Sequence, residues 1–182
     1  MSGHQPLAPH QRAVARRRTA FAKPFVWWVK EPLDVAAMQA AAAAFVGMKN
    51  FQSFAASDED DAETTKSTIV LVDRLEIQVR GDLLLVIIQG SHFLWKMVRR
   101  IVGVLVAIGR GQLDAESAST MFTSKSDLPP TLTAPGSGLF LERVFYPGEP
   151  LEADVTVPTP LTAFGTASSA STTGAVPSAK QR

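Results

Sequence analysis

One stretch of the sequence, GSHFLWKMVRRIVGVLVAIGRGQL at residues 90–113, carries four cations and no carboxylate. The cations are Lys96, Arg99, Arg100 and Arg110. Guanidinium groups bind phosphates and carboxylates through forked donors, and a lysine ammonium binds them as a point charge. The stretch therefore predicts a site for an anion, and phosphate is the first candidate.

The same stretch has two faces on a helical wheel of about 100° per residue between positions 93 and 110. The face expected to be core consists of Phe93, Leu94, Met97, Val98, Ile101, Val104, Leu105 and Ile108. The opposite face carries the four cations together with Gly103 and Ala107. Glycine inside a helix costs about 1 kcal/mol relative to alanine, so Gly103 requires close packing or a closely approaching ligand. Composition alone favours a solvated face with Gly103 packed under a neighbouring element; the anion site is the alternative.

Other residue patterns exclude several classes of site. The three histidines, His4, His10 and His92, lack the spacing of metal ligands. The sequence has no Walker loop, no Rossmann glycine pattern and no Ser-His-Asp constellation. Phe51 and Phe54 could stack on bases, but apolar packing is the favoured interpretation for both.

The charges are segregated along a chain of 182 residues whose formal net charge is only +1. Residues 1–24 carry five Lys or Arg and no acid, whereas residues 58–63 carry five carboxylates in six positions. The apolar runs are too short to cross a bilayer, so no membrane span is predicted. The absence of cysteine suits a reducing compartment. A cytoplasmic location is predicted, with an organelle as the alternative because the arginine-rich start resembles a transit peptide in composition.

The elements that must position the cations alternate between strands and helices. Residues 25–30 are β-prone, and residues 35–45 predict a helix that begins at Asp34 or Pro32 and ends before Gly47. Leu75, Ile77 and Val79 alternate with polar residues, which predicts a half-buried strand. A turn at residues 81–82 and a returning strand at residues 83–89 complete a hairpin.

The second half of the chain predicts two helices and a last strand. The cationic helix is followed by an amphipathic helix at residues 114–122, capped by Asp114 and stopped by the sequence DLPP. Residues 138–146 predict a strand with Leu139, Leu141 and Arg143 on one side. The order predicts an α+β fold, an antiparallel sheet with helices packed on one face. Residues 1–23 are expected to be a basic leader or interdomain linker, 24–147 the domain, and 148–182 a disordered tail.

Three motifs in order, GMKNFQSF, GSHFLWKMVRRIVGVLVAIGRG and TAPGSGLFLERVFY, resemble the C-terminal half of the tRNA pseudouridine synthase A family over residues 24–147. The resemblance implies the C-terminal half of the pseudouridine synthase fold and a cofactor-free isomerase that acts on uridines in tRNA. In that family an aspartate opens the attack, the glycosidic C–N bond breaks, and uracil rejoins through carbon. The target base must first leave its stack.

The resemblance also implies roles for single residues. Arg99 matches the family's arginine that pairs with the catalytic aspartate, and Leu139 matches the apolar residue that packs against uracil. Lys96, Arg100 and Arg110 are phosphate-contact candidates from the helical wheel, and Gly103 would admit the substrate. Two chains of the family form a homodimer that binds tRNA across both.

The sequence departs from the family in lacking its catalytic Arg-Thr-Asp-x-Gly motif. Asp34, Asp73 and Asp114 lie in no matching context, so none is expected to be the nucleophile. We therefore expect the catalytic aspartate to belong to an N-terminal domain that this chain lacks, and the chain alone to be inactive. The alternatives are a non-catalytic RNA-binding module and a degenerate remnant of such an enzyme.

Overall fold

Within residues 8–15, 23–56, 67–142 and 144–146, which the computed structural model describes, six strands form one sheet. Its order is β2-β1-β5-β4-β3, and β6 also pairs with β1. The strands are β1 (Ala8–Ala15), β2 (Trp27–Trp28), β3 (Gly47–Asn50), β4 (Ile69–Arg80), β5 (Leu83–Gly90) and β6 (Leu139–Leu141). Neighbouring strands are antiparallel except β1 and β2, which are parallel.

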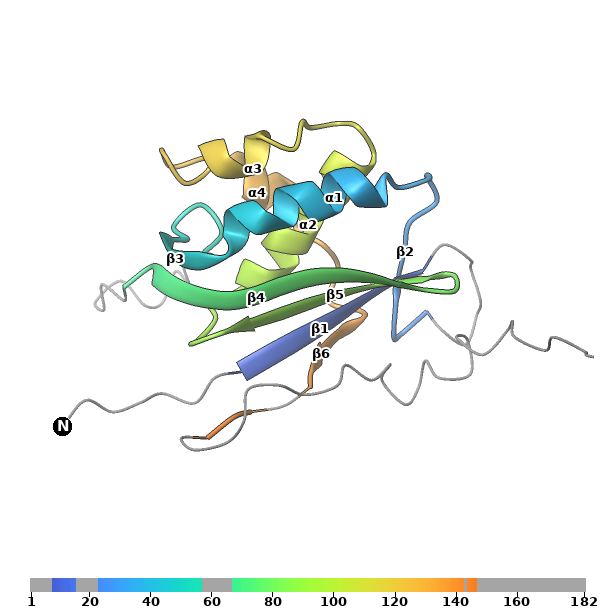
Figure 1. The fold of residues 1–182 in the computed structure, drawn as a ribbon, viewed down its shortest axis with the longest axis horizontal. Helices are drawn as coiled ribbons and strands as arrows, with labels where there is room; N and C mark the ends of the chain where they lie inside the picture. Colours follow the sequence, from blue (N-terminus) through green and yellow to red (C-terminus); the bar gives the residue numbers. More distant parts are fainter. Residues whose placement is uncertain (1–7, 16–22, 57–66, 143, 147–182) are drawn as a thin grey trace, which may run out of the picture.

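The helices lie together on one face of this sheet (Figure 1). They are α1 (Val35–Ala42), the 3-10 turn η1 (Ala43–Phe45), α2 (Met97–Gly109), α3 (Ser117–Thr120) and α4 (Leu128–Thr131). The predicted α+β fold, an antiparallel sheet with helices on one face, is therefore confirmed. No helix in the described ranges has the length and hydropathy needed to cross a membrane.

The predicted hairpin is present as β4 and β5. Its turn contains Gly81 with φ 57°, a left-handed conformation that glycine adopts without steric cost. Leu75 and Ile77 are buried, as the alternation predicts. Val79 is 47% exposed, and the prediction was wrong for it because it lies at the hairpin end of β4.

Sequence propensity also predicted the first helix. Asp34 caps α1 by accepting a hydrogen bond of 2.9 Å from the backbone nitrogen of Ala37. The helix continues through η1 to Phe45, and Gly47 follows with φ 98°. Met38 and Phe45 are fully buried, so this helix supplies part of the core over the sheet.

Strand β1 was not predicted, because it lies inside the segment interpreted as a basic leader or linker. It pairs with β5 from Ala8↔Gly90 to Ala15↔Leu83 and with β6 from His10↔Leu141 to Arg12↔Leu139. The segment therefore includes a strand inside the sheet. The short strand β3 was missed as well. The acidic run 58–63, Arg143 and the tail 148–182 lie outside the described residues.

The later helices differ from the prediction at their ends. Helix α2 begins at Met97 and not at position 93, because Lys96 before it has φ 61° and interrupts the helical conformation. Helix α3 is shorter than predicted, and Asp114 contributes its backbone oxygen to Ser117 at 3.0 Å and no side-chain cap. The sequence DLPP does follow the end of that helix, but it also begins α4.

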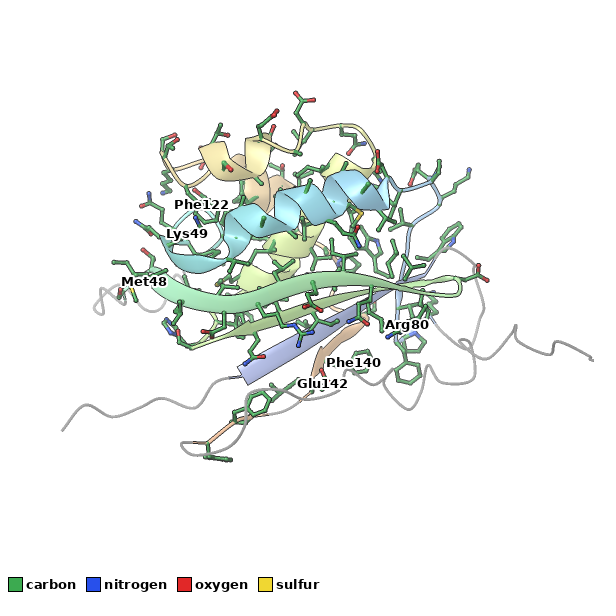
Figure 2. All side chains as sticks on the ribbon, viewed as in Figure 1. Met48, Lys49, Arg80, Phe122, Phe140 and Glu142 are labelled. Atoms are coloured by element: carbon green, nitrogen blue, oxygen red, sulfur yellow. The ribbon has the colours of Figure 1, made fainter. Side chains whose placement is uncertain are left out.

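Four phenylalanines form an aromatic cluster between the helices and the β3 end of the sheet. The edge-to-face pairs include Phe45 with Phe54 at 5.4 Å and Phe51 with Phe122 at 5.1 Å between ring centroids. Figure 2 shows Lys49 beside Phe122 on the helix side, with its Nζ 5.4 Å from the ring centroid. Phe51 and Phe54 are fully buried, so the interpretation of both as core residues is confirmed.

Candidate functional site

Helix α2 is covered on both sides, and this decides what its cations can do. The residues predicted to be core are buried from Met97 onward, while Phe93 and Leu94 precede the helix and are partly buried against the core. The opposite face is also covered, because Gly103 and Ala107 are buried there. The four cations therefore do not share one solvated surface.

Arg99 is held in place by the loop between α4 and β6. Its Nε donates a hydrogen bond of 2.7 Å to the backbone oxygen of Ala134. In return, the backbone nitrogen of Ala134 donates to the backbone oxygen of Arg99 at 3.1 Å. Ala134 is buried and Arg99 is partly buried, so the pair lies at the margin of the core.

The outer end of the Arg99 guanidinium remains available to a ligand. No carboxylate among the residues that the structure describes forms an ion pair with it. The two terminal amino groups of an arginine form a fork that matches the oxygens of a carboxylate or phosphate. Arg99 thus combines a fixed stem with a fork that lacks an acidic partner in the described ranges.

Gly103 explains why the loop can reach Arg99. A Cβ atom on Gly103 would lie 1.7 Å from the backbone oxygen of Leu132 and 3.4 Å from the backbone nitrogen of Ala134. Gly103 follows Arg99 by one helical turn, so both face the same loop. The sequence prediction of a close approach is confirmed. The approaching group is the chain's own Leu132, so Gly103 has a packing role in this structure, and its assignment as a substrate contact stays a prediction.

Leu139 lies at the end of the same loop, where β6 begins. Its backbone nitrogen donates to the oxygen of Gly136 at 3.3 Å, and its partly buried side chain packs against the core. The segment from Leu132 to Leu139 therefore contains the backbone oxygen that packs on Gly103, the contact to Arg99 and the first residue of β6. Leu139 follows the Arg99 contact at Ala134 by five residues of the chain.

Arg100 is the clearest correction to the cationic face. Its side chain is 8% exposed, and its Nη1 donates to the backbone oxygen of Ala55. Its Nε has no hydrogen-bond partner in the part of the chain that the structure describes. Burial lowers the pKa of this guanidinium, which still remains cationic. Arg100 thus holds the loop around Ala55 against α2. That loop covers the side of α2 that the helical wheel predicts to face solvent.

Arg110 lies at the other end of α2, about 16 Å along the axis from Arg99 at 1.5 Å per residue. Its Nη2 is 2.9 Å from a carboxylate oxygen of Glu31, and its guanidinium lies 5.9 Å from the centroid of the Trp27 ring. A backbone hydrogen bond at Glu31, and next the Arg110 cation, lower the pKa of the Glu31 carboxyl. Arg110 therefore has a local acid and an aromatic neighbour, and it is separate from Arg99.

Lys96 remains as an exposed cation close to Arg99 in the sequence. It lies directly before α2, and its side chain caps no backbone group of that helix. Lys96 precedes Arg99 by three residues, but its left-handed backbone places it outside the regular helix. Of the four predicted cations, the structure thus leaves Lys96 exposed, holds Arg99 on the loop at Ala134, buries Arg100 and pairs Arg110 with Glu31.

No group of three or more metal-ligating side chains occurs in the described ranges. A shallow hollow of about 320 Å³ lies around α3 and the start of α4. It is lined by Leu113, Ser117, Thr120, Met121, Thr123, Ser124, Lys125, Ser126 and Leu128. None of the predicted site residues lines it, so the Arg99 region remains the candidate site.

Sequence reasoning missed the backbone groups of Leu132 and Ala134. A backbone oxygen has no residue-type signature, so only the interior glycine at position 103 signalled that something approaches the helix. Sequence reasoning also gave no role to Trp95, the residue before Lys96, which is 61% exposed. The one signal for Trp95 was its position, since a large aromatic beside the cations is a candidate for contact with a ligand.

Comparison with known proteins finds one family that is similar to this chain. A family model described as tRNA pseudouridine synthase matches residues 41–147. The tRNA pseudouridine synthase A of Geobacter sulfurreducens is 38% identical over 130 residues, which cover 71% of this chain and 52% of that protein. The protein of the same name from Methylobacterium nodulans is 35% identical over 153 residues, covering 82% of this chain and 59% of the relative. The chain spans about half the length of the curated relatives it matches.

Proposed function

Because this chain belongs to the tRNA pseudouridine synthase family, we propose that it supplies the C-terminal half of an enzyme that converts uridine to pseudouridine in tRNA. The observation that carries the proposal is the state of Arg99. Its Nε is fixed on Ala134, and its outer fork has no acidic partner among the described residues. This arrangement suits an arginine that receives a carboxylate from another segment of the enzyme.

In the proposed reaction, that carboxylate is the catalytic aspartate. The bond between ribose C1′ and uracil N1 breaks, the base turns, and a bond forms between C1′ and uracil C5. The proton on C5 is released and N1 gains a proton, so product and substrate are isomers and no cofactor is required. Arg99 keeps the carboxylate ionised and aimed, because a cation close to a carboxyl lowers its pKa. Leu139 packs against the uracil ring, and Lys96 binds a phosphate.

The second candidate function is RNA binding without catalysis. It is favoured by one observation, that Lys96 and Arg99 have no acidic partner in the described ranges. In that case Lys96 and Arg99 would contact the RNA backbone, and affinity would fall steeply with added salt. For the complete enzyme we propose a homodimer in the cytoplasm with tRNA bound across both copies.

The two functions are separated by tritium release from tRNA labelled at uracil C5. We expect no release with this chain alone and release when a family N-terminal half carrying the aspartate is added. Arg99→Ala should reduce the release at least about a hundredfold, because it removes a charged donor from the reacting carboxylate. Arg80→Ala, which removes an exposed arginine at the hairpin, is the matched control and should leave the rate unchanged. Turnover by this chain alone would contradict the assigned role of the second segment.

A further inference from the structure

Two consecutive exposed side chains, Trp95 and Lys96, stand at the start of α2. Trp95 is 61% exposed, although tryptophan is usually largely buried. Its backbone oxygen accepts a hydrogen bond of 3.0 Å from the nitrogen of Ala56, so the backbone beneath the side chain is anchored. Lys96 follows with φ 61° and is also exposed. An anchored backbone therefore displays an indole ring and an ammonium group side by side.

Neither side chain is used by the fold that the structure describes. Trp95 forms no ring contact or cation–π contact with a described residue, whereas Trp27 lies against Arg110. Lys96 has no acidic partner in those ranges. Burying a tryptophan would stabilise the fold, so its exposure is unexplained by the packing of these residues.

We propose that Trp95 and Lys96 form a contact for single-stranded RNA, in which a base stacks on the Trp95 indole and Lys96 binds the adjacent phosphate. Stacking on an aromatic side chain tolerates any base, because every base has a π face. The proposal rests on the proposed function for its ligand. It adds that the stacked nucleotide lies near the target uridine, because Lys96 precedes Arg99 by only three residues of the chain.

The charges near Trp95 favour RNA over a protein partner. Lys96 and Arg99 have no acidic partner in the described ranges, whereas Arg100 is buried and Arg110 pairs with Glu31 at the other end of α2. A protein interface would instead place further exposed apolar residues around the tryptophan. Phe93 and Leu94, the apolar residues directly before it, already pack against the core. The surface at Trp95 thus offers one stacking plane with cations on one side.

The two side chains would bind through different forces, an uncharged stacking contact at Trp95 and a charge contact at Lys96. Their loss should therefore have different signatures. Loss of Trp95 should weaken binding by a similar factor at low and high salt. Loss of Lys96 should weaken binding at low salt and reduce the slope of log affinity against log salt by about 0.7.

The test uses the full chain with Trp27→Phe and Trp28→Phe, so that Trp95 is the sole tryptophan. Titration with a ten-nucleotide oligouridylate should quench its emission. Trp95→Ala in the otherwise native chain should weaken binding of the fluorescein-labelled oligonucleotide about tenfold or more, and Trp95→Phe should retain most of the affinity. Trp28→Ala is the matched control, because Trp28 is another exposed tryptophan, on β2, and its removal should not change the affinity.

Unquenched Trp95 emission, or equal affinity of the Trp95→Ala chain, would overturn the proposal. A blue shift of the emission with protein concentration and without RNA would also overturn it and would assign Trp95 to a contact between protein chains. RNA quenching of Trp95 emission in a chain that supports no tritium release, even with the family N-terminal half, would contradict the proposed function. The RNA contact at Trp95 would still hold in that case. Circular dichroism should show that Trp95→Ala folds, because the ring is exposed.

Discussion

The two ends of α2 carry arginines with opposite surroundings. At the C-terminal end, Arg110 pairs with Glu31 and lies over Trp27, so its charge is satisfied within the chain. Near the N-terminal end, Arg99 is held by the backbone oxygen of Ala134 and meets no carboxylate in the described ranges. The difference leaves Arg99, and not Arg110, without an acidic partner in the described ranges, which is what the proposed role of Arg99 requires.

The largest effect that bears on this comparison is expected from Gly103→Ala. The added Cβ would lie 1.7 Å from the oxygen of Leu132, and a backbone group cannot move away without displacing the loop that fixes Arg99. We expect a loss of about 3 kcal/mol in the free energy of unfolding. Denaturant unfolding measures it, and hydrogen exchange at the Ala134 amide should speed up.

Gly136→Ala is the matched control for that prediction, because nothing lies within 4 Å of the added Cβ and the residue belongs to the same loop. Its effect on the free energy of unfolding should stay within about 0.5 kcal/mol. If both alanine variants were equally stable, the close packing of Leu132 on α2 would be wrong.

Substitution of Arg100 should have the second-largest effect on the free energy of unfolding, because this side chain is buried. Arg100→Ala leaves the Ala55 oxygen without its donor and removes buried packing, so we expect a loss of about 2 kcal/mol. Arg100→Met keeps most of the side-chain volume. It removes a guanidinium whose Nε has no hydrogen-bond partner in the described ranges. Thermal unfolding should therefore show Arg100→Met to be the more stable variant. Equal losses would show that the charge itself is required.

The smallest effect is expected from the ion pair at the C-terminal end of α2, in which Arg110 is partly buried and Glu31 is exposed. Arg110→Ala should lower the unfolding midpoint less than Arg100→Ala does, and added salt should reduce the difference from wild type. The lowered pKa of Glu31 sets the sign of the pH dependence. The pair stabilises the fold above the unfolded carboxyl pKa of about 4.3, and this stabilisation is lost as the pH falls through the folded pKa. A midpoint difference that persists in 1 M salt would contradict this account.

Elements with strong local signals could be predicted from the sequence. The hairpin follows from alternation and the glycine turn, and α1 follows from helix propensity and the Asp34 cap. Strand β1 could not be predicted, because it forms through pairing with β5 and β6, which are distant in the sequence. The start of α2 was displaced because a lysine with positive φ has no signature in a hydrophobic period.

The candidate site could be predicted only in part, because contacts between segments that are distant in the sequence also shape it. The helical wheel placed all four cations opposite the core, but Lys96 lies before the helix with φ 61°. The wheel also could not tell which loop covers which side of the helix. Arg100 therefore seemed exposed and proved buried under the segment of Ala55. Gly103 indicated a close approach without identifying Leu132 as the approaching group. The residue types show that the helix carries cations. Which of these cations can reach a ligand depends on the loops that cover the helix in the folded chain.

The most direct test of the central claim is nitrogen-15 NMR of the Arg99 guanidinium. In this chain alone, the Nε proton should exchange slowly because it is bonded to Ala134, while the terminal amino groups rotate freely. Adding the family N-terminal half should slow that rotation, and the same half with its aspartate changed to asparagine should not. Terminal amino groups that are already restrained in the chain alone, or an unprotected Nε proton, would contradict the account.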